Sequence, residues 1–208
     1  MEKVLLTGIS GFLGHQCAVE LLKKGYYVKG SLRDMNKKSE VLNGIKKEID
    51  PSEKLEFIKL DLLSDDGWED AMEGCKYVLH VAAPFSVKEP NDENEYIEPI
   101  RGGTMRALKS AQKAKVKRFV LTSSAVTMMG VVYDSDQDTG IVDTKDWTNP
   151  DSKNINTYIK AKTLMEKAAW EFYGNQSDDS SIEMAVMCAG GIYGPSLTGN
   201  LSGFSSNA

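Results

Sequence analysis

The amino-acid sequence predicts an α/β fold, a doubly wound parallel sheet with helices on both faces. Two observations carry this prediction. Short apolar segments alternate with helix-like segments along about 190 residues, and a glycine-rich turn joins the first segment of each kind. In such an alternation each helix carries the chain back along the sheet, so that successive strands run parallel.

The expected strands are short and rich in apolar residues. They are predicted at residues 3–7, 26–32, 55–60, 77–83, 117–123 and 182–188. The fourth reads Tyr-Val-Leu-His-Val-Ala-Ala, a nearly continuous apolar run. Such runs are typical of parallel strands that are buried on both faces of a sheet.

The expected helices lie between these strands. They are predicted at residues 12–24, 37–49, 65–74, 93–114 and 156–174, and Gly25 ends the first. One long polar segment, residues 133–156, joins the fifth strand to the last helix. A connection of that length in a compact domain is usually functional or mobile.

The glycine-rich turn directly follows the first expected strand. Gly8, Gly11 and Gly14 have the spacing GxxGxxG. A strand–turn–helix unit places unpaired backbone N–H groups and the positive end of a helix dipole at one point, which suits a phosphate. At the start of a βαβ pattern this spacing predicts a dinucleotide site in a Rossmann-type fold, although simple strand-to-helix turns share it.

Composition and charge exclude several classes of protein. The 208 residues carry a formal net charge of −5, with a pI near 5.2, so no basic surface for nucleic acid is expected. No apolar run approaches the roughly 18 residues of a membrane span. The chain enters a strand by residue 4, which leaves no room for a signal peptide, and we expect a cytoplasmic protein.

Cysteines and histidines are few and widely separated. The cysteines are Cys17, Cys75 and Cys188, and the histidines are His15 and His80. Their spacing matches no metal-binding or disulfide pattern, so we expect reduced thiols and no metal site.

A tyrosine and a lysine lie one turn apart on the last expected helix. Tyr158 and Lys162 have i, i+4 spacing and share one helix face. A neighbouring ammonium is expected to lower the pKa of a phenol, which suits proton transfer at a carbonyl or alcohol oxygen. Ser123 and Ser124 follow the fifth strand, at the sheet edge where ligands bind, although serines there also serve as turn or cap residues.

Eight segments in order resemble the extended short-chain dehydrogenase/reductases of the NAD-dependent epimerase/dehydratase superfamily. Within them, the sequence is similar to dihydroflavonol reductases, cinnamoyl-CoA reductases and related aldehyde or ketone reductases. The segments are TGISGFLG (7–14), GSLRD (30–34), DLL (61–63), GCKYVLHVAAP (74–84), RFVLTSSA (118–125), DWTNPD (146–151), TYIKAKTLMEKAAW (157–170) and GGIYGP (190–195). UDP-sugar epimerases share the glycines and the Ser/Tyr/Lys set, but usually lack the tail TLMEKAAW.

The resemblance implies a role for each matching residue. Ser124 would polarise the substrate oxygen, Tyr158 would donate or accept the proton, and Lys162 would bind the nicotinamide ribose. The implied cofactor contacts are Gly8, Gly11, Phe12, Leu13 and Gly14 at the pyrophosphate, Asp61 and Leu62 at the adenine, and Val81, Ala82 and Ala83 at the end of the fourth strand.

Cofactor choice depends on the end of the second strand. An acidic residue there selects NAD, whereas an arginine accommodates the 2′-phosphate of NADP. Both types occur, as Arg33 and Asp34, and similar reductases use the arginine with a later lysine, here Lys38. We expect NADP(H) in preference to NAD(H). Asp34 would then cap the following helix, and the alternative for the lysine is a solvated helix face.

The match to the family ends near residue 197. We expect residues 1–190 to form the dinucleotide-binding Rossmann domain, and residues 191–208 to begin a substrate region and end in a disordered tail. Family members continue for about another hundred residues, so the small C-terminal substrate lobe is expected to be largely absent. Cys188 and Ala189 also replace the proline-containing pair that usually precedes GGxxGP.

The predicted function is that of an NADP(H)-dependent oxidoreductase that reduces a small-molecule ketone or aldehyde to an alcohol through a Ser-Tyr-Lys site. One alternative is an NAD-dependent sugar epimerase or dehydratase, in which the hydride returns to the same substrate. The other is a truncated, non-catalytic protein that binds the cofactor. The sequence determines neither the substrate nor the oligomeric state.

Overall fold

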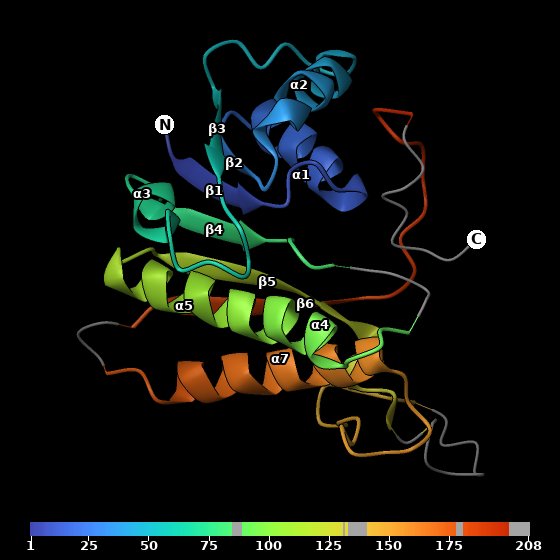
Figure 1. The fold of residues 1–208 in the computed structure, drawn as a ribbon. Coiled ribbons are helices and arrows are strands. Elements are labelled where there is room, and N and C mark those ends of the chain that lie inside the picture. The colour runs from blue at the N-terminus through green and yellow to red at the C-terminus, as the bar shows by residue number, and fades with distance from the viewer. Residues whose placement is uncertain (85–88, 131, 133–140, 178–180, 200–208) are drawn as a thin grey trace.

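A computed structural model describes residues 1–84, 89–130, 132, 141–177 and 181–199 (Figure 1). Six parallel strands form one sheet, in the order β3-β2-β1-β4-β5-β6. The strands are β1 (Lys3–Thr7), β2 (Tyr27–Leu32), β3 (Leu55–Lys59), β4 (Tyr77–His80), β5 (Arg118–Ser124) and β6 (Glu183–Ala189). The predicted doubly wound parallel sheet is confirmed.

Helices cover both faces of the sheet. They are α1 (Phe12–Lys23), α2 (Lys38–Lys46), α3 (Trp68–Met72), α4 (Asn94–Ile97), α5 (Gly103–Lys113) and α7 (Thr157–Gly174). Figure 1 shows α1 and α2 on one side of the sheet, and α5 and α7 on the other. Each helix therefore occupies the place that the alternating sequence pattern predicts.

The core consists of two apolar layers separated by the sheet. Leu5 and Leu6 are adjacent on β1 and fully buried, but they belong to different layers. Leu5 packs in the layer that contains Leu108 of α5 and Met165 of α7, whereas Leu6 packs in the layer of α1 and α2. Successive side chains of a strand point to opposite faces, which explains why these strands are apolar at consecutive positions.

Residues 93–114 form three connected segments instead of the single helix that we expected. After α4, residues Glu98–Gly102 form a π-helical segment, η2, and α5 continues from Gly103. Pro99 lies within this segment and has no backbone N–H to donate to the preceding turn. The wider π turn accommodates the proline while the chain remains helical.

Strand β4 ends at His80, three residues before the predicted end. The next two backbone N–H groups, those of Val81 and Ala82, donate to the hydroxyl of Thr7, at 3.0 and 3.1 Å. Both groups therefore bond to a side chain instead of to a neighbouring strand, and β4 ends.

The long segment after β5 returns to that strand. Its residues 133–140 lie outside the described part of the chain, and residues 141–156 form no helix or strand. Thr148 anchors it, because its hydroxyl donates to the Val126 carbonyl at 2.6 Å and its N–H donates to the Thr127 carbonyl at 2.8 Å. The segment is thereby held beside the carboxyl end of β5.

The residues that follow β6 pack against the first half of the chain. Leu197 is buried in the layer of α1 and α2, and its carbonyl accepts a hydrogen bond from Lys47 Nζ at 2.8 Å. The boundary at residue 190 stays a prediction, and the predicted tail lies outside the described residues from 200 onward. In the described part of the chain, no helix combines the length and apolarity needed to cross a membrane.

Candidate functional site

The strand order reverses at β1, whose neighbours are β2 on one side and β4 on the other. In an open parallel sheet, this reversal leaves a crevice at the carboxyl ends of the strands, where ligands bind. The predicted glycine turn begins there, directly after Thr7. The sheet topology therefore places the predicted dinucleotide site at the position where such folds hold one.

The geometry of the turn requires glycine at two of the three predicted positions. Gly8 has φ +72°, and a Cβ atom there would lie 2.8 Å from Ala82 Cα. A Cβ atom at Gly14 would lie 2.1 Å from the carbonyl oxygen of Gly8. Gly11 closes the turn by donating its N–H to that same oxygen at 3.0 Å. These contacts let α1 begin close against β1.

Helix α1 presents an uncapped N-terminus to the crevice. Gly11 is its N-cap and has no side chain with which to bond the first N–H groups. The first turn contains no acidic residue, and it begins with buried Phe12 and half-buried Leu13. The positive end of the helix dipole thus faces the crevice without a competing carboxylate, which suits a pyrophosphate.

Two hydroxyl groups fix the turn from the neighbouring strands. Ser31, buried in β2, accepts the N–H of Gly8 on its Oγ at 3.1 Å, and its carbonyl accepts the N–H of Ile9 at 3.3 Å. Thr7 accepts the N–H groups of Val81 and Ala82, as described above. We did not predict these roles of Ser31 and Thr7, although each is a hydroxyl residue near the carboxyl end of a strand.

The Thr7 hydroxyl continues into a buried chain of hydrogen bonds. Because its oxygen already accepts two N–H groups, its proton goes to His80 Nδ1, at 3.0 Å. Thr104 donates its own proton to the Ile100 carbonyl at 2.8 Å, so it accepts from His80 Nε2, at 3.2 Å. His80 is therefore the neutral tautomer with the proton on Nε2. Burial, followed by the charge of Lys162, lowers the pKa of His80 to about 3.

The residues predicted to select the cofactor lie at the carboxyl end of β2. Arg33 is exposed directly after the strand, and Lys38 begins α2 with its ammonium 5.7 Å from the centre of the Phe57 ring. Asp34 caps the short helix Met35–Lys37 by accepting the N–H of Asn36 at 3.0 Å. The Asp34 carboxylate thus serves as a helix cap. The side chains of Arg33 and Lys38 are exposed to solvent beside the crevice.

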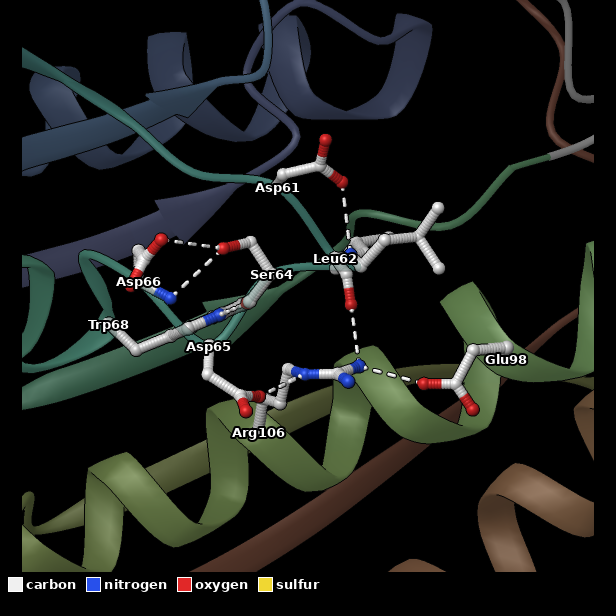
Figure 2. A network of polar contacts seen from close by, with 9 residues as sticks. Asp61, Leu62, Ser64, Asp65, Asp66, Trp68, Glu98 and Arg106 are labelled. Atoms are coloured by element: carbon white, nitrogen blue, oxygen red, sulfur yellow. Dashed lines mark hydrogen bonds and ion pairs between the residues drawn. The ribbon is translucent and has the colours of Figure 1, made fainter.

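The predicted adenine contacts lie in the loop after β3, shown in Figure 2. Asp61 folds the loop by accepting the N–H of Leu63 on Oδ1 at 3.0 Å. Arg106 of α5 holds it, because its Nη1 donates to the Leu62 carbonyl at 2.9 Å and to Glu98 Oε1 at 3.0 Å. Sequence analysis missed Arg106, which lies more than forty positions along the chain from its loop partners.

The predicted catalytic residues come from β5 and α7. Ser124 is the last residue of β5, and α7 begins after Asn156, whose side chain accepts the N–H of Ile159 at 2.9 Å. The hydroxyls of Ser124 and Tyr158 are hydrogen-bonded to each other. Lys162, only 4% exposed, donates from Nζ to the Thr122 carbonyl at 2.9 Å. The structure thus brings all three residues to the carboxyl end of β5.

Burial has the largest effect on the pKa values of Tyr158 and Lys162. It raises the pKa of Tyr158, and the hydrogen bond from Ser124 offsets only part of that effect. Burial also lowers the pKa of Lys162 to about 8. The prediction that Lys162 lowers the pKa of Tyr158 is wrong for this arrangement, because desolvation of the phenol outweighs the favourable contacts. At neutral pH, Tyr158 is a protonated phenol and most of Lys162 is an ammonium.

The cysteines and the histidines show no second reactive cluster. Among the described residues, no group of three His, Cys, Asp or Glu side chains is arranged to hold a metal ion. The three cysteines are free thiols, and burial raises the pKa of each. The polar groups at the sheet edge are thus the main candidates for chemistry.

Comparisons with known proteins agree with this geometry. A family model described as NAD dependent epimerase/dehydratase family matches residues 4–207. Dihydroflavonol 4-reductase of Arabidopsis thaliana is 34% identical over an alignment of 206 residues, and the match covers 95% of this chain and 51% of that protein. Tetraketide alpha-pyrone reductase 1 of the same plant is 35% identical over an alignment of 203 residues, and the match covers 96% of this chain and 60% of that protein.

A solved structure supports the same relationship. The yeast methylglyoxal/isovaleraldehyde reductase Gre2, complexed with NADPH, superimposes with a TM-score of 0.81 at 26% identity. The match covers 93% of this chain and 59% of the yeast enzyme. The chain therefore spans between half and two thirds of the length of these relatives, which belong to the reductase group that its motifs resemble.

The Thr7 network yields a testable prediction. Thr7→Val removes the acceptor of two N–H groups and the donor to His80, so the free energy of unfolding should fall by about 1–3 kcal/mol. Urea denaturation measures this change. Amide hydrogen exchange at Val81 and Ala82 should accelerate in the same variant.

Thr163→Val is the matched control, because Thr163 is also fully buried but donates only to the Ile159 carbonyl of its own helix. Thr163→Val should leave the amide exchange rates of Val81 and Ala82 unchanged. Thr7→Ser keeps the hydroxyl, so these two amides should exchange as slowly in it as in the unmodified chain. Equal protection of the two amides in Thr7→Val and the unmodified chain would contradict the network.

Proposed function

This chain belongs to the NAD dependent epimerase/dehydratase family, and from that premise we propose that it is an NADP(H)-dependent oxidoreductase. Its reaction would reduce a ketone or aldehyde group of a small molecule to an alcohol. The observation that carries the proposal is the meeting of Ser124 and Tyr158 above buried Lys162, at the sheet edge that also holds the glycine turn.

The residues at the crevice fit the parts of the cofactor. The uncapped N-terminus of α1 would bind the pyrophosphate, and Arg33 with Lys38 would bind a 2′-phosphate. The loop of Asp61 and Leu62, held by Arg106, would contact the adenine. Val81, Ala82 and Ala83 would line the path toward the nicotinamide. Gre2, to which the chain is similar, is known as a complex with NADPH.

When held at this crevice, NADPH would supply the hydride for the carbonyl carbon of the substrate. The Ser124 hydroxyl would donate a hydrogen bond to the carbonyl oxygen and hold it beside Tyr158. Tyr158 would then transfer its phenolic proton to that oxygen, which completes the alcohol and leaves a phenolate. Lys162 would bind the nicotinamide ribose, and solvent would return a proton to the phenolate.

The raised pKa of Tyr158 is consistent with this direction of reaction. A proton donor must hold its proton at the working pH, and a phenol with a pKa above its ordinary value does so at neutral pH. Tyr158 is therefore in the protonation state that donation to a carbonyl oxygen requires.

Arg33 gives the first prediction for this function. If its guanidinium binds the 2′-phosphate, Arg33→Ala should weaken NADPH binding roughly tenfold to hundredfold, since a charge-assisted bond contributes about 1.5–3 kcal/mol. NADH binding should change little. Titration calorimetry measures both affinities.

Lys37→Ala is the matched control, because it removes an equal charge from an exposed position in the short helix Met35–Lys37, four residues after Arg33. It should retain the preference for NADPH. Equal affinity of the unmodified chain for NADPH and NADH would show that Arg33 does not select the cofactor.

Tyr158 gives the second prediction. Tyr158→Phe removes one hydroxyl, so the fold and NADPH affinity should be retained while carbonyl reduction falls by about 10²–10⁴-fold. Consumption of NADPH with a panel of aldehydes and ketones measures the rate. Tyr173→Phe, an exposed position on the same helix, should leave it unchanged.

Retention of full activity in Tyr158→Phe would remove the tyrosine from the proposed reaction. Cofactor binding by the unmodified chain, without turnover of any compound in the panel, would instead favour a cofactor-binding protein that does not catalyse reduction.

A further inference from the structure

Glu166 is a buried carboxylate that the proposed reaction does not use. It lies on α7, one helical turn after Lys162, and is only 5% exposed. Ionised carboxylates are rarely buried this deeply unless several donors compensate for the lost water. Its surroundings therefore indicate a specific role.

Hydrogen-bond donors surround the Glu166 carboxylate. The Ser123 hydroxyl donates to Oε2, as does that of Thr127 at 2.8 Å. Trp170 Nε1 donates to Oε1 at 3.3 Å, and the Cys188 thiol approaches Oε2 at 3.7 Å. These donors come from β5, from the turn that follows it, from α7 and from β6. One carboxylate thus joins four segments of the chain.

Two of these donors flank the proposed catalytic serine. Ser123 directly precedes Ser124, and Thr127 lies in the short helix Ala125–Thr127 that directly follows it. Both are bound to a residue of α7, the helix that carries Tyr158 and Lys162. Glu166 therefore connects the strand end that holds Ser124 to the helix that holds the other two residues.

Glu166 also acts on Lys162 through its charge. Burial lowers the pKa of Lys162, and the carboxylate of Glu166 opposes this effect and raises it. The other titratable groups that act on this lysine or feel its charge are His80 of β4, which is neutral at physiological pH, and the Cys188 thiol of β6, whose pKa is raised. Among the described residues, Glu166 is the carboxylate that compensates the buried ammonium.

We propose that Glu166 is a positioning residue of the Ser124–Tyr158–Lys162 site: it fixes the carboxyl end of β5 against α7 and supplies the countercharge of the Lys162 ammonium. This inference rests on the proposed function for its catalytic meaning. The contact that Glu166 makes between β5 and α7, and its effect on the charge of Lys162, are properties of the folded chain. Both are measurable without turnover.

The test compares Glu166→Gln with the unmodified chain. Glutamine retains the size of the side chain and an acceptor oxygen for Ser123, but removes the charge. NMR with ¹³Cε-labelled lysine follows the titration of Lys162, which should move down from about 8 by about one pH unit, a tenfold loss of proton affinity. Glu171→Gln makes the same change of charge at an exposed position of α7 and should leave that titration unchanged.

The pH dependence of NADPH binding separates the charge from a general loss of structure. Binding that requires the ammonium weakens as pH rises through the pKa of Lys162. With a pKa about one unit lower, Glu166→Gln should bind NADPH as well as the unmodified chain at pH 6, and about fivefold more weakly at pH 8. Binding that is weakened equally at both pH values would overturn the role of Glu166 as the countercharge of Lys162.

A further variant keeps the proposal falsifiable if Glu166→Gln does not fold. Glu166→Asp must retain the titration of Lys162 near that of the unmodified chain. An unshifted lysine in folded Glu166→Gln overturns the inference, whereas failure of NADPH to bind any variant overturns only the proposed function.

Discussion

The hydroxyl of Thr7 is the contact on which the geometry of the sheet edge depends. It lies at the end of β1, where the strand order reverses, and accepts the N–H groups of Val81 and Ala82 as β4 ends. These two amides bond to a side chain instead of to a neighbouring strand. Because Ala82 is held at this position, residue 8 must be glycine, since any Cβ atom there would collide with it. The turn into α1 follows from that constraint.

Buried polar groups connect the ends of β1 and β5 to the helices that pack beside them. His80 joins the end of β1 to Thr104 of α5, and Glu166 joins the end of β5 to α7. Lys162 lies between them, lowers the pKa of His80 and is itself compensated by Glu166. Buried polar networks are favourable only when their members are bonded, and each of these groups has its partners. The bonds of His80 thereby support the end of β1, from which the glycine turn starts, and the bonds of Glu166 support the Ser124–Tyr158 pair.

The sequence predicted the elements whose signals are local. Strand β1 matches its predicted bounds, α7 begins one residue after its predicted start, and the glycines stand in the turn that their spacing indicates. The early end of β4 was not predicted, because it depends on the distant hydroxyl of Thr7. The π turn was also not predicted, although Pro99 lies within it. The roles of Thr7, Ser31, Arg106 and Glu166 also depend on contacts between remote segments. The raised pKa of Tyr158 depends on burial, which i, i+4 spacing does not reveal.

A crystal structure of the 208-residue chain grown with NADP⁺ would test the central claim most directly. We expect the pyrophosphate at the N-terminus of α1, the 2′-phosphate beside Arg33, and the nicotinamide ribose within hydrogen-bond distance of Lys162. The nicotinamide ring would then lie next to the Tyr158 hydroxyl. Density for the cofactor at another surface, or a nicotinamide turned away from Tyr158 and Ser124, would contradict the account.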